Sequence, residues 1–429
     1  MTKKFNPFRP NQPVYSGMFV GRMDEIKRID KILFQTKNGN PTNILIIGEK
    51  GIGKSSLLLV TKYFASGEIS FEQDKYNFLT ITIGMDEKTT LIDLARKIKL
   101  GLERELKVNQ KLLSTIQGAW SFFQRIETNI VKVRDANQTE TPDEFIDNLI
   151  FSLVDSVKTL TSKDENIIDL HCRKDGLVIL IDEADKSLDD LSLGSFLKLL
   201  SERLVSEGCN QVLIVLAGLP RLRDVLYKSH SSSLRLFEEL ELSPLSPEEV
   251  KTVISRGLKE SYDKSQVETK IEPEALDLIV GFSEGYPHFV QQIGYSAFDT
   301  DTDNNITVND AQIAMFMPSG AIDLIGNRYY KNLYYSQIRE EAYRKILQIM
   351  ASKWNEWITK SEIKQQFQGT ASTLDNGITT LIKRNIILKK EGARGIYRLQ
   401  WASFAFWIKN FTRMEQQAAA DKKQNGQSQ

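Results

Sequence analysis

The chain has 429 residues, which is longer than a single hydrophobic core usually grows, so two or three domains are expected. Lysine plus arginine and aspartate plus glutamate number 56 each, which excludes a whole-chain field that would attract nucleic acid or an anionic membrane surface. Two distant cysteines exclude a disulfide framework or a zinc module. No apolar run is long enough to span a membrane, so a cytoplasmic protein is predicted.

Buried-strand patterns alternate with helical patterns through the first half of the chain. Residues 1–15 carry several prolines, which disfavour helix, and are predicted to form an extended arm. The mainly apolar run at residues 43–47 predicts a strand that is buried on both faces. Similar runs follow at residues 78–83, 177–181 and 212–217. Helical patterns separate these runs, so residues 16–245 are predicted to form an α/β domain, a parallel sheet with helices on both faces.

The stretch of residues 107–175 is long for one crossover between strands and is predicted to be a helical insertion. Thr141 and Glu144 have the spacing of a capping box that opens one of its helices.

The pattern becomes helical after residue 245. Ser246 and Glu249 have the spacing of a capping box at the start of the first helix. Further helices are predicted at residues 338–350, 360–367 and 372–385, followed by a two-stranded ribbon over residues 386–399. The tail of residues 416–429 is small and polar and is predicted to be disordered.

Aspartates between residues 299 and 310 have most of the spacing of a calcium-binding loop, but Asn304 stands where that loop requires glycine. The alternative is a polar loop in which Thr307 or Asn309 caps the next helix.

The segment from Gly48 to Ser55 fits the pattern G-x-x-x-x-G-K-[ST] and lies between a buried strand and a helix, as a phosphate-binding loop requires. Glycines let the backbone wrap the phosphates, and successive N–H groups then face the anion. Lys54 is predicted to place a positive charge near the β and γ phosphates, and Ser55 to bind Mg²⁺. The predicted nucleotide-binding residues of this segment are Gly48, Glu49, Lys50, Gly51, Ile52, Gly53, Lys54, Ser55 and Ser56.

The apolar strand at residues 177–181 ends in Asp182 and Glu183, at the edge where open α/β sheets bind their ligands. Asp182 is predicted to hold Mg²⁺ through water, and Glu183 to orient and polarise an attacking water. ATP or ADP with Mg²⁺ are therefore the predicted cofactors, and ATP hydrolysis is the predicted reaction. Asp185 is predicted to be solvated.

Three further motifs accompany these residues. Residues 19–25 read F-V-G-R-M-D-E, residues 217–220 read A-G-L-P, and residues 285–287 read G-Y-P. With the phosphate loop, they resemble the AAA+ and STAND P-loop ATPases, especially the branch near the origin-recognition initiators and archaeal STAND ATPases. The resemblance implies a helical lid over residues 246–325 and a winged helix over residues 326–415. It also implies nucleotide contacts from Phe19, Val20, Gly21, Arg22, Pro287 and His288.

The resemblance also implies an arginine finger that completes a neighbouring subunit's site. Arg235, just before the last strand of the sheet, best fits that position; the alternative is an ordinary solvated arginine, and Arg221 and Arg223 fit less well. His288 stands where many relatives have a lid arginine, and it either reports the γ phosphate weakly or is an exposed residue that begins a helix. The strand at residues 212–217 lacks the polar sensor residue of many AAA+ enzymes, which argues against fast hydrolysis.

The winged-helix segment is locally basic, although the whole chain is neutral. Its basic residues are Lys383, Arg384, Lys389, Lys390 and Arg394. They either contact duplex DNA through phosphates or belong to a module that governs nucleotide state and assembly, as in STAND proteins.

Three functions stay open. The first is a regulatory ATPase of the STAND kind, for example in bacterial defence, whose nucleotide state controls self-assembly and a partner effector protein. The second is a DNA-binding AAA+ ATPase of the initiator or transposition-regulator type. The third is an enzyme that acts on a small phosphoryl acceptor, for which no pocket can be named. None of these involves a membrane.

Overall fold

The computed structural model describes residues 4–14, 17–70, 75–107, 110–121, 123, 142–187, 189–353, 356–384, 386–390 and 392–411. The chain forms two compact units, one of Pro13–Ser243 and the other of Met1–Gln12 with Pro244–Gln429. The predicted cap at Thr141 and the predicted tail of residues 416–429 lie outside the described residues.

The unit Pro13–Ser243 is built, in its described residues, on a five-stranded sheet of order β2-β3-β4-β1-β5. Its strands are β1 (Asn43–Ile47), β2 (Leu79–Gly84), β3 (Leu177–Asp182), β4 (Val212–Gly218) and β5 (Phe237–Glu241). All neighbouring strands pair in parallel, which confirms the predicted sheet. The carboxyl ends of parallel strands share one edge, so the loops after β1, β3 and β4 meet there.

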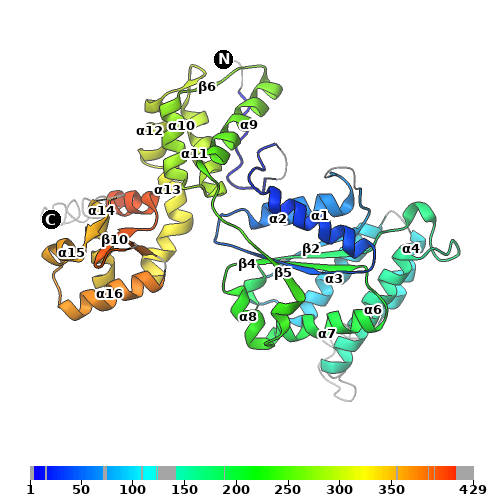
Figure 1. The fold of residues 1–429 in the computed structure, drawn as a ribbon. Coiled ribbons are helices and arrows are strands. Elements are labelled where there is room, and N and C mark those ends of the chain that lie inside the picture. The colour runs from blue at the N-terminus through cyan, green and yellow to red at the C-terminus, as the bar shows by residue number, and fades with distance from the viewer. Residues whose placement is uncertain are drawn as a thin grey trace, which may run out of the picture. The chain divides into compact units, whose positions relative to one another are not determined.

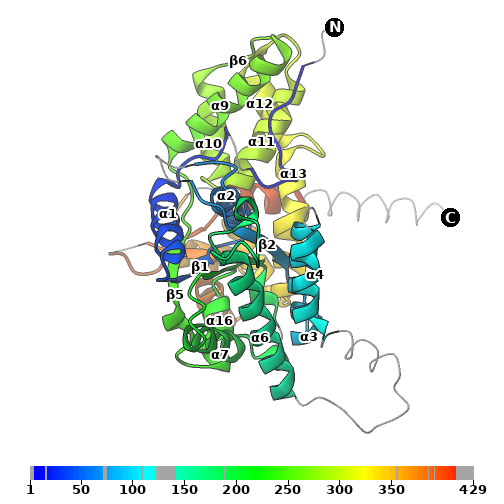
Figure 2. The ribbon, with the colours of Figure 1, turned by 90° about the vertical axis from the view of Figure 1, so that its right-hand side faces the viewer.

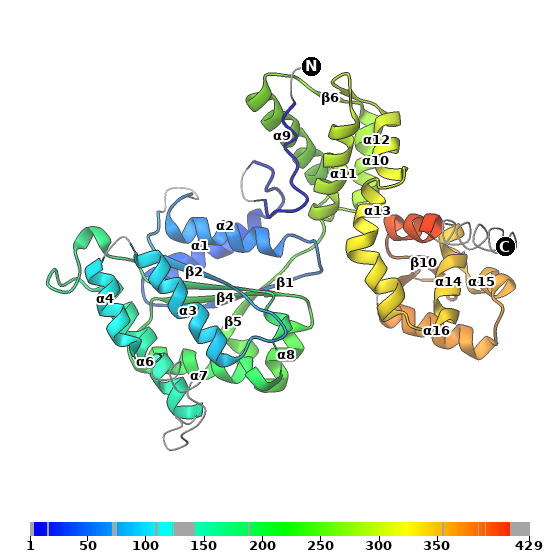
Figure 3. The ribbon, with the colours of Figure 1, turned by 180° about the vertical axis from the view of Figure 1, so that it is seen from behind.

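Helices cover both faces of this sheet, as predicted. Helices α1 and α2 lie on one face, and α3, α6 and α7 lie on the other (Figure 1; Figure 3). The helices are α1 (Met23–Lys37), α2 (Lys54–Ser66), α3 (Leu91–Leu106), α4 (Gln110–Ala119), α6 (Pro142–Thr161), α7 (Leu193–Ser206) and α8 (Leu222–Ser229). Short 3-10 turns occur at η1 (Leu170–Cys172), η2 (Ala184–Lys186), η3 (Asp189–Leu191) and η4 (Ser233–Leu236).

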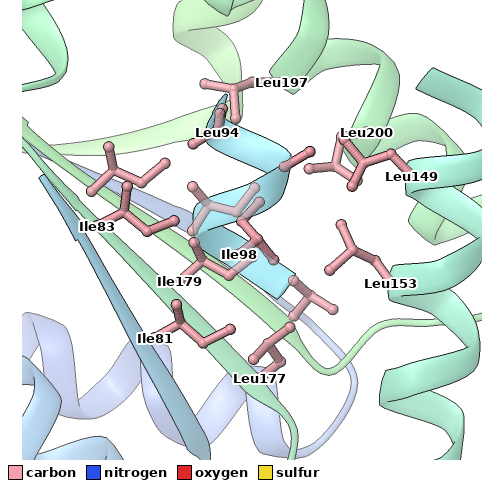
Figure 4. Close-up of a cluster of buried hydrophobic side chains, with 14 of the residues drawn as sticks. Ile81, Ile83, Leu94, Ile98, Leu149, Leu153, Leu177, Ile179, Leu197 and Leu200 are labelled. Atoms are coloured by element: carbon pink, nitrogen blue, oxygen red, sulfur yellow. The ribbon is translucent and has the colours of Figure 1, made fainter. Parts of the chain in front are cut away.

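The helices of the predicted insertion belong to the hydrophobic core of this unit. Helix α4 lies beside α3, and α6 lies against α4 and α7, so the two inserted helices extend this layer (Figure 2). Buried Trp120 donates a hydrogen bond from Nε1 to Ser156 Oγ, 3.1 Å away, which joins the two inserted segments. Figure 4 shows the core side chains between the sheet and these helices, among them Ile81, Ile179, Ile98, Leu153 and Leu200. The insertion therefore thickens the helical layer on this face of the sheet.

The second unit begins with helices whose first cap is the predicted one. The Ser246 backbone N–H donates to Glu249 Oε2 at 2.7 Å, and the Glu249 N–H donates to Ser246 Oγ at 3.2 Å. The helices are α9 (Pro247–Ser265), α10 (Pro273–Ser283), α11 (Pro287–Thr300), α12 (Val308–Phe316) and α13 (Ala321–Ile325), and π-helical turns follow at η5 (Gly326–Tyr330) and η6 (Leu333–Gln337). Two short strands, β6 (Lys270–Ile271) and β7 (Asn305–Ile306), pair in parallel, which the helical pattern did not predict.

The loop before α12 has a local structural role. Thr307 and Asp310 form the capping box of α12, which is the predicted alternative to a calcium loop. Asp301 is buried, and its carboxylate accepts a hydrogen bond from Lys4 Nζ at 2.5 Å. In the described residues, no three acidic, histidine or cysteine side chains gather as metal ligands would.

Three helices and a small sheet complete the second unit close to their predicted places. They are α14 (Glu341–Ser352), α15 (Lys360–Gln366) and α16 (Ala371–Lys383), with strands β8 (Ile358–Thr359), β9 (Ile387–Lys389) and β10 (Ile396–Leu399). Strand β10 pairs antiparallel with both β8 and β9, so the predicted ribbon gains a third strand. None of the helices in the described ranges has both the length and the apolar content that crossing a membrane requires.

Candidate nucleotide site

The loop between β1 and α2 has a backbone that depends on its glycines. Gly51 and Gly53 have φ values of +85° and +102°, in the left-handed region that favours glycine. A Cβ atom on Gly48 would lie 2.7 Å from Ile52 Cγ2, so a side chain there would displace the loop. The loop then enters α2 directly at Lys54, which leaves backbone N–H groups at a helix N-terminus.

Lys54 folds back over this loop. Its ammonium group donates hydrogen bonds to the carbonyl oxygens of Gly48 at 2.9 Å and Glu49 at 2.8 Å. Burial lowers the pKa of Lys54, while nearby carboxylates, Asp182 foremost, act in the opposite direction. A phosphate group is the kind of anion that stabilises such a half-buried positive charge.

The predicted metal ligands come together at the carboxyl edge of the sheet. Ser55 Oγ, in the first turn of α2, donates to Asp182 Oδ2 at 2.5 Å. Asp182 ends β3, and its other carboxylate oxygen accepts the N–H of Glu183 at 2.8 Å. The two residues thus present adjacent oxygen atoms, the donor type that Mg²⁺ prefers, so this donor set fits the ion.

Glu183 lies one residue beyond this pair, with a left-handed φ of +56° that turns the chain sharply. Its side chain is 55% exposed and forms an ion pair with Lys186 Nζ at 2.7 Å. The hydrogen bond that Lys186 donates to the Glu183 carboxylate raises the pKa of Lys186. Glu183 is therefore an accessible carboxylate beside the predicted metal ligands, which is where a water-orienting residue has to be.

The prediction that Asp185 is solvated is wrong. Its side chain is only 5% exposed, because the turn after β3 folds against the end of β4. Asp185 Oδ1 accepts the backbone N–H of Leu219 at 3.0 Å, and Oδ2 accepts Arg221 Nε at 2.9 Å. The side chains of β4 itself are all apolar and buried, as predicted. Asp185 thus places a carboxylate at the end of β4, although the strand supplies no polar sensor residue.

The segment before α1 also contacts the loop. Gly21 has a φ of +73°, and the Arg22 side chain that follows is buried. Arg22 Nη2 donates to the carbonyl oxygens of Ser243 at 2.6 Å and Ile52 at 3.3 Å. Phe19 and Val20, just before this turn, are half-buried. Arg22 thus joins this segment to the phosphate loop, and Ser56 of α2 accepts the backbone N–H of Val14 at 3.0 Å.

The remaining predicted residues are Arg235, Pro287 and His288. Arg235 is an exposed residue of η4, immediately before β5. Arg223, by contrast, forms ion pairs with Glu239 and Glu241, which raise its pKa. Pro287 and His288 belong to the second unit, where they begin α11. The His288 ring is half-buried, 5.1 Å from the ring of Tyr329, so it is not the exposed helix-starting residue that one alternative predicts.

The sheet order, the glycine loop after β1 and the acidic pair after β3 are the features of the P-loop AAA+ fold. Residues 18–215 match the AAA ATPase domain family.

Two known proteins resemble the chain over most of its length. An uncharacterized HTH-type transcriptional regulator of Methanocaldococcus jannaschii is 24% identical over 398 residues, which cover 92% of this chain and 90% of that protein. The fold is similar to that of the Aeropyrum pernix ORC2 protein, whose structure contains ADPNP-ADP complexes. That similarity has a TM-score of 0.59 at 13% identity, and it covers 97% of this chain and 99% of the other. The predicted likeness to origin-recognition initiators is confirmed for the fold.

Proposed function

We propose that the chain binds and hydrolyses ATP, and that it changes conformation and assembly with its nucleotide state. The observation that carries the proposal is the convergence of Lys54, Ser55 and Asp182 at one edge of the sheet, with Glu183 beside them. The left-handed glycines and the α2 N-terminus would surround the phosphates, and Lys54 would neutralise their charge. Ser55 and Asp182 would hold Mg²⁺, which supplies charge stabilisation in phosphoryl transfer.

Glu183 would orient and polarise the attacking water, and Arg235 would act on the site of a neighbouring copy. The apolar β4 supports slow turnover, which suits a switch more than a metabolic enzyme. In this proposal Phe19, Val20 and Gly21 seat the adenine, and the second unit, with its lid helices and winged helix, responds to the bound nucleotide. Copies of this chain form the assembly that depends on the bound nucleotide, and a partner effector protein binds to this assembly.

The first test removes the charge that holds the phosphates. Lys54→Ala should weaken ATP binding at least ~10-fold, because the ammonium group of Lys54 would make charge-assisted hydrogen bonds to phosphate oxygens. Isothermal titration calorimetry measures the change. Lys62→Ala, about two turns further along α2, is the matched control and should bind ATP like the wild type. Equal ATP affinity in the Lys54→Ala variant and the wild type would contradict the proposed site.

A second candidate function is duplex DNA binding by the second unit. Lys383, Arg384, Lys389, Lys390 and Arg394 are all exposed, at the end of α16 and around the β9–β10 hairpin. Lys390 Nζ also lies 5.9 Å from the ring centre of Trp357, an exposed aromatic residue. The relative described as an HTH-type transcriptional regulator favours this reading.

If this basic surface binds duplex DNA, it does so mainly through phosphates. Affinity should then depend little on base sequence and fall steeply with salt, with about one unit of log-log slope lost for each phosphate contact removed. Fluorescence anisotropy with a labelled duplex, with ATP present, measures both. The triple variant Lys389→Glu, Lys390→Glu, Arg394→Glu should lose the binding.

The matched control replaces three exposed lysines of the other unit by glutamate, namely Lys27, Lys31 and Lys228. It therefore changes the net charge by the same amount as the triple variant. It should bind DNA like the wild type. The same low-salt affinity in the wild type and the hairpin variant would exclude this DNA surface and favour the partner-protein switch.

A further inference from the structure

The chain passes between its two units at two peptide bonds, Gln12–Pro13 and Ser243–Pro244. In each case a proline follows the boundary, and proline fixes its own φ and restricts the residue before it. Both passages are therefore stiffer than a typical linker. The contacts of the residues that flank each passage decide whether a movement in one unit is transmitted to the other.

In the unit Pro13–Ser243, the first passage is bonded to the first turn of α2, and the second is bonded to Arg22, which is also bonded to the nucleotide loop. Ser56 Oγ accepts the N–H of Val14, the second residue after the first passage, at 3.0 Å. Arg22 Nη2 donates to the carbonyl of Ser243, the last residue before the second passage, at 2.6 Å. The same nitrogen donates to the carbonyl of Ile52 in the loop at 3.3 Å.

The burial of Arg22 makes its hydrogen bonds to these carbonyl groups important. Arg22 is only 7% exposed, and its Nη1 atom lies 3.6 Å from the carboxylate of Glu25. A buried guanidinium group needs its hydrogen-bond acceptors, so the Ser243 and Ile52 carbonyls are held more firmly than surface groups would be. A shift of Ile52 on phosphate binding therefore acts on Ser243 through a single side chain.

On the side of the second unit, the passages are fixed as well. Only Pro244 separates Ser243 from Leu245, whose N–H donates to the carbonyl of Gly285 at 2.8 Å. Gly285 has a φ of +75°, and a Cβ atom there would lie 2.2 Å from the Leu245 carbonyl oxygen, so the two segments are in close contact. This contact leads directly into the turn that begins α11.

The segment before the first passage is anchored on the lid helices. Phe8 is 3% exposed and lies against Gly294 of α11. The N–H of Arg9 donates to Gln291 Oε1 at 2.8 Å, and its guanidinium group forms an ion pair with Glu260 of α9 at 2.6 Å. The N-terminal segment of residues 4–12 is therefore a strap bound to α9 and α11.

We propose that Arg22 and Ser56 are positioning residues that transmit the nucleotide state of the loop to the second unit, by holding both chain passages. This inference rests on the proposed function, because it requires that the loop binds ATP and ADP. Arg22 acts on Leu245 and the Gly285 turn through Ser243 and Pro244. Ser56 acts on the strap and on α9 and α11 through Val14 and Pro13.

Hydrogen exchange of the full chain, with Mg²⁺ and either ADP or a non-hydrolysable ATP analogue, tests the proposal. In the wild type, exchange of the Leu245 and Arg9 amides should differ between the two nucleotides by about fivefold, the factor that corresponds to one net hydrogen bond. Arg22→Gln should abolish the difference at Leu245, and Ser56→Ala should abolish it at Arg9. Each variant is measured at nucleotide concentrations that saturate it in its own titration.

Two further variants separate transmission from general loosening. Arg22→Lys keeps a positive donor for the two carbonyls and should retain at least part of the difference, and it also serves if Arg22→Gln does not fold. Arg28→Gln is the matched control, because Arg28 also joins α1 to β5, through Glu238 at 2.6 Å and the Glu239 carbonyl at 2.8 Å, without touching the loop. It should behave like the wild type.

Three results would overturn the transmission proposal: a full difference at Leu245 in Arg22→Gln, loss of that difference in Arg28→Gln, or no difference in a wild type that binds both nucleotides. A wild type that binds neither nucleotide by calorimetry would instead refute the proposed function itself.

Discussion

Replacing Glu183 by glutamine should leave ATP binding intact and slow ATP hydrolysis at least ~10²-fold, the lower end of what a general base contributes. The glutamine amide keeps the size of the side chain but cannot polarise an attacking water. Glu183 follows Asp182 directly and remains accessible, so the change should affect the chemical step without disturbing the Ser55–Asp182 pair. Phosphate release under steady-state conditions measures turnover, and calorimetry measures binding.

Glu202→Gln is the matched control for this prediction. Glu202 is an equally exposed glutamate, and it also pairs with a lysine, Lys198, in the same α-helix. Its loss should leave turnover unchanged, since α7 carries none of the predicted metal or nucleotide ligands. Equal turnover in Glu183→Gln and the wild type would show that another group orients the water.

Features that depend on neighbouring residues could be predicted from the sequence. The apolar runs of β1, β3 and β4 identify strands that are covered on both faces, and the loop pattern from Gly48 predicts where the proposed phosphate site begins. The Ser246–Glu249 capping box could also be predicted from the sequence, because its two hydrogen bonds join residues three positions apart. The convergence of Ser55 and Asp182 followed from the parallel sheet, which brings its strand ends to one edge.

Features that depend on distant partners could not be predicted. Asp185 is buried because Leu219 and Arg221, 34 and 36 residues further on, supply its hydrogen-bond donors. An acidic residue after a strand looks the same in sequence whether it has such donors or is solvated. The burial of Phe8 likewise depends on Gly294 of α11, 286 residues further on, and the two-residue strands β6 and β7 are too short to show periodicity.

The proposed role of Arg235 as an arginine finger predicts the second large effect on ATP hydrolysis. Arg235→Ala should reduce hydrolysis by ~10³ or more if Arg235 stabilises the transition-state charge in a neighbouring copy. The structure favours Arg235 over Arg223, because Arg223 is held by Glu239 and Glu241 of its own chain while the Arg235 side chain is exposed just before β5. Arg203→Ala, which removes an exposed arginine of α7, is the matched control and should keep full activity.

An arginine finger that acts between copies predicts two further results, which a residue that acts within its own chain does not predict. Specific activity should rise with protein concentration as copies assemble. Mixing Arg235→Ala with Glu183→Gln should restore part of the turnover, because some interfaces then pair an intact Glu183 with an intact Arg235. Arg235→Ala alone cannot distinguish a finger from a residue that merely supports β5, whereas the mixture can, since complementation requires both residues at one interface. Activity that is independent of concentration and shows no complementation would mean that each copy hydrolyses ATP alone, and the chain would then be a monomeric switch.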